Sequence, residues 1–161
     1  MARYGCGSKG AALMECINPR RNRWRVRWGF VVCEDGENAS WVEADFDHKP
    51  SADEIRAEVA DFTNRIVDER ILSGYEWNGH PVWLSQVNQL NYKATFDRAV
   101  QTLGKNLPVT FKLGTDVDPV YYEFKTIDEL QDFYFGALEW IEKCIEEGWT
   151  VKDGVDLTAF V

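Results

Sequence analysis

Few residues in this chain have the type and spacing that chemistry requires. Of its two histidines, His48 precedes Lys49 and Pro50, and His80 stands beside an Asn-Gly turn between Trp77 and Trp83. His80 is the better candidate for general acid–base work or for binding, although a histidine among aromatic residues more commonly packs or hydrogen-bonds. Trp77, His80 and Trp83 are therefore our candidate residues for a pocket or for stacking on a ligand.

Metal and cofactor motifs are missing from the sequence. Asp116 and Asp118 provide only half of a calcium loop, because the closing glutamate is absent. The cysteines lie far apart with no Cys-x-x-Cys pair, and we expect them to be reduced thiols (Cys6, Cys16, Cys33 and Cys144). The glycine-rich start lacks the spacing of a phosphate loop. We therefore expect no metal, no cofactor and no enzymatic activity.

The charge is unevenly distributed along the chain. The net charge is −9, but residues 1–28 carry seven basic side chains and one acid, and the rest of the chain is strongly acidic. Attraction between the basic start and the acidic remainder, within one molecule or between neighbours, follows from this asymmetry. We expect no nucleic-acid partner. We also expect no membrane partner, because no apolar run approaches the ~18 residues of a membrane span.

The first hairpin contains a row of arginines. From Trp24 onward, apolar side chains alternate with Arg23, Arg25 and Arg27, which predicts a half-buried strand followed by a turn and a second alternating strand. The arginines then face Glu43 and Asp45, either as a neutralised sheet face or as a docking surface. We expect Trp41, and also Trp140, on the outer side of its element. The candidate interface is therefore Arg23, Arg25, Arg27 and Trp41.

The remaining pattern predicts an α+β fold of antiparallel hairpins and three capped helices, in the order β-β-α-(ββ)-α-β-β-α. Capping boxes begin helices at Ser51 and Thr126, and Ser85 caps the helix between them. The expected ends of the three helices are Gly74, Gly104 and Gly148. We predict an irregular tail from Trp149, a flexible or partner-ordered arm at residues 1–20, and a single α+β domain at 21–161.

Four segments carry a resemblance to a known family. They are Gly79–Ala94 (GHPVWLSQVNQLNYKA), Leu107–Lys112 (LPVTFK), Tyr121–Phe124 (YYEF) and Gly148–Asp153 (GWTVKD). Over roughly residues 49–156 the chain resembles small uncharacterised proteins of Bacteroides genomes and prophages. It is also similar to a domain of unknown function in phage tail and tail-fibre-associated proteins. The resemblance implies a phage or prophage structural or accessory protein, made in the bacterial cytoplasm and carried in the virion, or a domesticated gene. It supplies no catalytic residues.

Three functions remain open at this stage. The first is a non-enzymatic assembly module that docks through the arginine row and the N-terminal arm onto an acidic surface of a like subunit or a phage tail component. The second is a carbohydrate-binding module that reads a glycan receptor with surface tryptophans. The seven tryptophans and six tyrosines are many for this length, and they either fill the core or leave a surplus on the surface for such binding. The third is an acidic inhibitor of a host nuclease.

Overall fold

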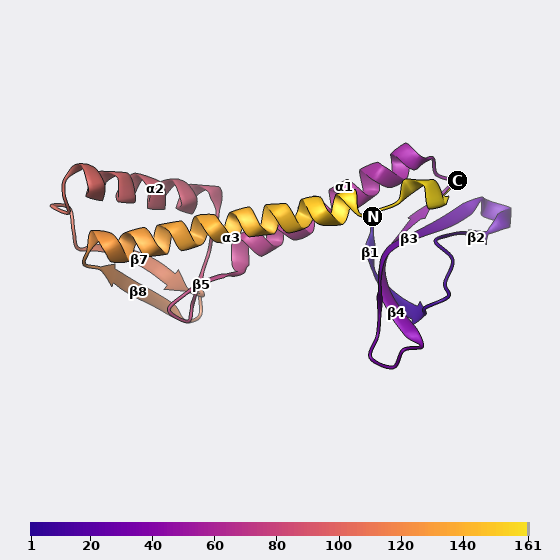
Figure 1. The fold of residues 1–161 in the computed structure, drawn as a ribbon, viewed down its shortest axis with the longest axis horizontal. Coiled ribbons are helices and arrows are strands. Elements are labelled where there is room, and N and C mark those ends of the chain that lie inside the picture. Colours follow the sequence, from indigo (N-terminus) through magenta and orange to yellow (C-terminus); the bar gives the residue numbers. More distant parts are fainter. Residues whose placement is uncertain (161) are drawn as a thin grey trace. The chain divides into compact units, whose positions relative to one another are not determined.

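The computed structural model describes residues 1–160, which form two compact units (Figure 1). Unit 1 combines residues 1–65 with the chain from residue 148 onward, and unit 2 is the continuous segment 66–147. Helices α1 (Ala52–Ser73) and α3 (Ile127–Asp153) each contribute residues to both units. The α+β class is confirmed. The single domain predicted for residues 21–161 is replaced by these two units.

Unit 1 is built on a four-stranded antiparallel sheet. Its strands are ordered β1-β4-β3-β2, namely β1 (Arg3–Ser8), β4 (Asn38–Phe46), β3 (Arg23–Val32) and β2 (Met14–Asn18). The predicted N-terminal arm is thus corrected, because residues 3–8 and 14–18 pair with β4 and β3 as the two edge strands. Its glycines obscured the strand pattern in the sequence, since glycine is depleted in strands.

One face of this sheet forms the core of unit 1. Val26 and Trp28 of β3 are buried, and the Trp28 ring meets Phe62 of α1 edge-on, with centroids 6.3 Å apart. The predicted alternation ends at Gly29, whose φ of +64° accompanies a shift in register between Trp28 and Val31. The bulge turns Phe30 to the opposite face, where its ring lies 5.2 Å from that of Trp41. Phe30 therefore does not continue the row of core-facing side chains formed by Val26 and Trp28.

The first capping box forms as predicted at the start of α1. Ser51 Oγ accepts from the Glu54 N–H at 3.3 Å, and Glu54 Oε2 accepts from the Ser51 N–H at 2.8 Å. His48 joins this cap, because its Nε2 lies 2.7 Å from Glu54 Oε1 and its Nδ1 lies 2.8 Å from Asp47 Oδ1. The hydrogen bonds from Ser51 and His48 hold the pKa of Glu54 at about 2. Both ring nitrogens of His48 are therefore engaged by carboxylates at the start of α1.

Unit 2 surrounds an aromatic core. Its elements are the ribbon β5–β6 (Tyr75–Trp77 and His80–Val82), the hairpin β7–β8 (Val109–Gly114 and Pro119–Phe124), helix α2 (Gln86–Gln101) and parts of α1 and α3. Ser85 caps α2 as predicted, accepting from the Asn88 N–H at 3.2 Å. Phe124 of β8 and Phe133 of α3 are fully buried, with ring centroids 4.9 Å apart. The hairpin and the helices therefore share one core.

The third helix runs past its predicted end. Gly148 is buried inside α3, which continues to Asp153 and is followed by the 3₁₀ helix η2 (Leu157–Phe160). A glycine in a helix costs only about 1 kcal/mol, so packing can override it. Lys152 donates to Asn64 Oδ1 at 3.0 Å, and Phe160 is buried. The irregular tail is therefore corrected to a continued helix and a packed helical turn.

Candidate functional site

The arginine row lies on the outer face of the unit 1 sheet and is paired there. Arg25 Nε donates to Asp45 Oδ1 at 2.6 Å, as the cross-strand register predicts. Arg27 donates to Glu15 Oε1 at 2.6 Å and to the Ala12 carbonyl at 2.9 Å. Six residues form this network, which we call the charged sheet face (Arg3, Glu15, Arg25, Arg27, Glu43 and Asp45).

The charges at the centre of this face are largely shielded from water. The side chains of Arg27 and Glu43 are each 9% exposed, and Arg27 Nε lies 3.5 Å from Glu43 Oε2. Burial acts to raise the pKa of Glu43, but the Trp41 hydrogen bond and the neighbouring arginines outweigh it and leave that pKa below its usual value. The hydrogen bond from Arg25 lowers the pKa of Asp45. The neutralised sheet face, rather than a free docking surface, is the arrangement found.

Trp41 lies on this outer face, as predicted, but its side chain is buried rather than exposed. Its side chain is buried because Gly5 and Gly7 of β1 leave room for the indole to lie across the strand. Its Nε1 donates to Glu43 Oε2 at 3.0 Å. Trp140, also expected outside, packs against the unit 2 core and donates to the Arg70 carbonyl. Neither residue therefore offers a free ring to a partner.

Unpaired basic charge remains at one turn of unit 1. The 3₁₀ turn η1 (Pro19–Arg21) exposes Arg20 and Arg21, whose side chains make no hydrogen bond or ion pair within residues 1–160. Arg23 follows, with a side chain 47% exposed and 4.0 Å from Asp45. We call Arg20, Arg21 and Arg23 the basic turn. Of the predicted interface, only Arg23 belongs to it.

The predicted pocket trio is only partly brought together. Trp77 and His80 are register partners on the β5–β6 ribbon, but Trp77 packs into the core, 5.6 Å from the Phe133 ring. Trp77 Nε1 is buried without a hydrogen-bond partner in the described part of the chain. Trp83 follows β6 and lines a cleft that neither of the other two lines. The trio is therefore not one site.

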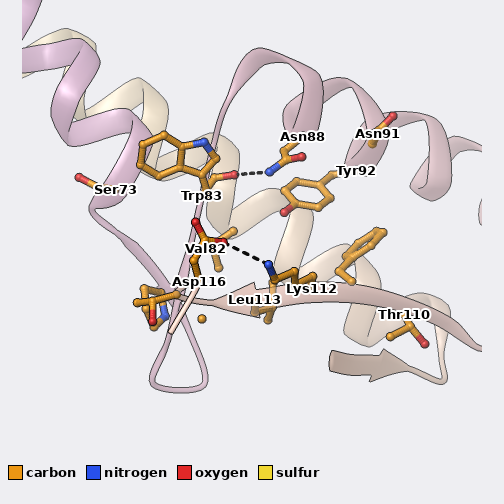
Figure 2. A pocket seen from close by; sticks show the side chains of 14 residues that line it. Ser73, Val82, Trp83, Asn88, Asn91, Tyr92, Thr110, Lys112, Leu113 and Asp116 are labelled. Atoms are coloured by element: carbon orange, nitrogen blue, oxygen red, sulfur yellow. Dashed lines mark hydrogen bonds and ion pairs between the residues drawn. The ribbon is translucent and has the colours of Figure 1, made fainter. Parts of the chain in front are cut away.

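This opening, which we call the Trp83 cleft, has a volume of about 680 Å³ (Figure 2). The Trp83 side chain is 55% exposed, whereas Tyr92 beneath it is buried and packs on Phe111 with centroids 4.6 Å apart. Most of its polar groups come from α2 and from β7 with its following loop (Asn88, Asn91, Thr110, Lys112, Thr115 and Asp116). The sequence analysis missed Asn88 and Asn91, although their spacing of three on a predicted helix places them on one face.

A second, more apolar opening lies between α2 and α3 in unit 2. We call it the α2–α3 groove; its volume is about 300 Å³, and it is lined by Leu90 and Lys93 of α2 and by Tyr134, Leu138 and Ile141 of α3, among others. Leu90 is 66% exposed and Leu138 is 37% exposed, and Val87, one turn before Leu90, is 68% exposed. This face resembles a helix pair from which a partner is missing.

The described residues offer no metal cluster. Within residues 1–160 no three His, Cys, Asp or Glu side chains are placed to hold an ion. All four cysteines are free thiols, and burial raises the pKa of Cys144. In the same part of the chain no helix is both long and apolar enough to cross a membrane.

The fold and these surfaces define a two-unit α+β protein with a mixed aromatic–polar cleft and an apolar helix–helix groove. Comparison with models of protein families, with curated proteins and with solved structures finds no significant match.

Proposed function

We propose that this protein is a non-enzymatic assembly module whose copies dock head to tail. The observation that carries the proposal is the exposed aliphatic surface of Leu90 and Leu138, which line the α2–α3 groove, together with that of Val87, one turn before Leu90. Burying apolar area of this kind contributes roughly 25 cal/mol per Å², and it is the main source of affinity between proteins. A tail-associated structural role, which the family resemblance implies, requires contacts of this type.

Charge indicates which surface fills the groove. Unit 2 holds 14 acidic and seven basic residues between positions 66 and 147, a net charge of −7. Glu142 lies one turn beyond Leu138 on α3, is exposed, and makes no hydrogen bond or ion pair with its side chain among residues 1–160. The occupant is therefore an apolar side chain flanked by basic ones. In unit 1, Ile17 is 39% exposed and precedes Arg20 and Arg21 of the basic turn.

The proposed contact is thus between residues 17–23 of one copy and the α2–α3 groove of another. Ile17 enters the groove, and Arg20 and Arg21 approach the acidic surface of α3. The two patches differ, so the contact is heterologous and produces a ring or an open filament rather than a closed dimer. The charged sheet face is not used, because its arginines are already paired.

Light scattering tests this contact at low and high salt. We expect the wild-type mass to exceed that of a monomer and to fall as salt screens the charges. Arg20→Glu with Arg21→Glu abolishes association at both salt concentrations. The control is Arg98→Glu with Lys105→Glu, which changes the net charge by the same amount as the first double variant but at exposed residues of unit 2. We expect this control to retain association.

A second pair of variants tests the apolar part. Leu90→Asp removes the aliphatic surface of the groove and abolishes association, whereas Val117→Asp, at a residue 96% exposed in a loop, leaves it intact. Circular dichroism confirms that each variant is folded. A wild-type chain that stays monomeric at low salt over the whole concentration range overturns head-to-tail docking, as does an oligomer that Leu90→Asp leaves unchanged.

A further inference from the structure

The Trp83 cleft shares Tyr92 with the lining of the α2–α3 groove but is otherwise lined by different residues, and its chemistry points to a small ligand. Its volume of about 680 Å³ falls within the roughly 300–1,000 Å³ of typical ligand sites. Aromatic and aliphatic walls (Trp83, Tyr92, Phe111 and Val82) alternate with amides, hydroxyls and one ion pair. This combination binds a molecule that is apolar on one face and polar at its edges.

The backbone beneath Trp83 is fixed before any ligand arrives. The Trp83 carbonyl accepts from Asn88 Nδ2 at 2.8 Å, as Figure 2 shows. Leu84 follows, with its N–H donating to the Leu72 carbonyl at 3.0 Å and its carbonyl accepting from Gln89 Nε2 at 2.7 Å. Val82 and Leu84 are each 1% exposed and anchor both sides of the tryptophan. The exposed indole is therefore a pre-organised platform, and binding loses little backbone entropy.

Polar groups with spare hydrogen-bonding capacity surround this platform. The Asn91 side chain makes no hydrogen bond within residues 1–160, and Trp83 Nε1 likewise has no partner there. Lys112 Nζ donates to Asp116 Oδ1 at 3.2 Å, but the Asp116 side chain is 99% exposed and the lysine is half exposed. Such a pair exchanges readily for ligand hydroxyls, because exposed ion pairs contribute only about 0–1 kcal/mol.

Charge excludes the anionic ligands. Lys112 and Asp116 are the only charged residues that line the cleft, so its own charge is zero. The surrounding unit has a net charge of −7, which repels phosphates, nucleotides and acidic sugars. Asp116 is already paired with Lys112, so the lining has no net charge to bind a cation. A neutral ligand fits best, with a flat apolar face for the indole and hydroxyl edges for the amides and the carboxylate.

We propose that the Trp83 cleft binds a neutral pyranose unit of a glycan. The C–H face of the ring stacks on the Trp83 indole, and Asn91 and Asp116 hydrogen-bond to its hydroxyl groups. This site is independent of head-to-tail docking, because Trp83, Asn91 and Asp116 lie neither in the basic turn nor in the lining of the α2–α3 groove.

An array of oligosaccharides tests the site with the full-length chain. Its probes are neutral homo-oligomers of glucose, galactose, mannose and N-acetylglucosamine, with sialylated and uronic-acid oligosaccharides as the anionic comparison. We expect neutral probes to bind and acidic probes to give background signal. Calorimetry with a bound probe then measures a loss of affinity of about tenfold or more for Trp83→Ala, equivalent to about 1.4 kcal/mol, because the sugar ring loses its stacking surface.

Matched variants separate stacking from general damage. Trp149→Ala removes a tryptophan of equal exposure (56%) in unit 1 and leaves affinity unchanged, while Trp83→Phe retains part of it. Asn91→Ala weakens binding without altering the unfolding midpoint. The proposal is overturned if no neutral probe binds, if only acidic probes bind, or if Trp83→Ala binds as tightly as the wild type.

Discussion

At the scale of single residues, the arginine row shows how pairing decides the role of a charge. Arg25 and Arg27 are the most engaged of the predicted interface residues, whereas Arg20 and Arg21, which the sequence analysis did not single out, are free to act. Removing one member of a partly buried pair destabilises the fold, because its partner is left uncompensated. Charge reversal at Arg25 or Arg27 would therefore report on folding rather than on docking.

Asp45 makes this structural role measurable through pH. Arg25 lowers the pKa of Asp45, so the folded chain keeps this carboxylate charged to lower pH than the unfolded chain does. Its stabilisation is complete above the unfolded pKa of about 4 and is lost as the pH falls through the folded value. We expect Asp45→Asn to lower the free energy of unfolding by about 1–3 kcal/mol at neutral pH. Near pH 2 this difference should shrink towards zero, because the protonated carboxyl resembles the amide.

Urea unfolding at a series of pH values gives this comparison. Asp118→Asn, at an exposed loop carboxylate, serves as the control and should follow the wild type throughout. A difference between Asp45→Asn and wild type that stays constant from neutral to acid pH would show that the carboxylate charge does not stabilise the sheet.

At the scale of elements, the packing of β1 against Trp41 requires glycine at positions 5 and 7. A Cβ at Gly5 would lie 2.7 Å from Trp41 Nε1, closer than packed atoms allow. We expect Gly5→Ala to displace the indole or the strand and to destabilise the protein by about 1–3 kcal/mol. Amide hydrogen exchange should show lost protection in β1 and in the residues of β4 that pair with it.

Gly10→Ala is the matched control for this change. A Cβ at Gly10 would meet only Ser8 Oγ, at 3.9 Å, so stability and exchange should match those of the wild type. Equal exchange in β1 for both variants would mean that Trp41 does not require the glycines.

Local rules in the sequence predicted most of the elements but not those that depend on distant packing. The capping box at Ser51, the cap at Thr126 and the alternation from Trp24 to Trp28 depend on residues close together in the sequence, and they form as expected. Edge strand β1 was missed because its glycines are explained only by Trp41, far away in the chain. The predicted end of the third helix at Gly148 was wrong for a related reason, because tertiary contacts keep α3 helical beyond this glycine.

In the candidate site, too, the residues with a local sequence signal were predicted, and those that depend on distant packing were not. Trp83 was predicted as a ligand-stacking residue because an exposed aromatic beside a turn is visible locally, and it does line a cleft. Phe111 and Asp116 come from a hairpin that meets α2 only in the folded unit, so their proximity to Trp83 could not be read from spacing. Trp77 was misplaced because the aromatic core that it joins brings together α2, the β7–β8 hairpin and α3, which lie apart in the sequence.

At the scale of the whole molecule, the two units differ in how the chain encodes them. Every member of the buried aromatic and aliphatic cluster of unit 2 lies between Tyr75 and Ala137, inside one continuous segment. Unit 1 needs both ends of the chain, because the segment from residue 148 onward contributes Phe160 and the Lys152 hydrogen bond to Asn64. Unit 2 is therefore encoded by one continuous segment, whereas unit 1 requires two segments that are far apart in the sequence.

This difference predicts the behaviour of fragments. We expect residues 66–147 alone to unfold cooperatively in urea and to keep the near-ultraviolet circular dichroism of packed aromatic rings, because the entire core cluster is retained. Leu130→Ala, at a fully buried residue, should lower the stability of that fragment by about 2–5 kcal/mol. Residues 1–65 should not fold alone, since they lack the C-terminal segment of unit 1. A 66–147 fragment with helical signal but no cooperative transition would instead mean that unit 2 requires the rest of α1 and α3, and that the two helices couple the units into one folding unit.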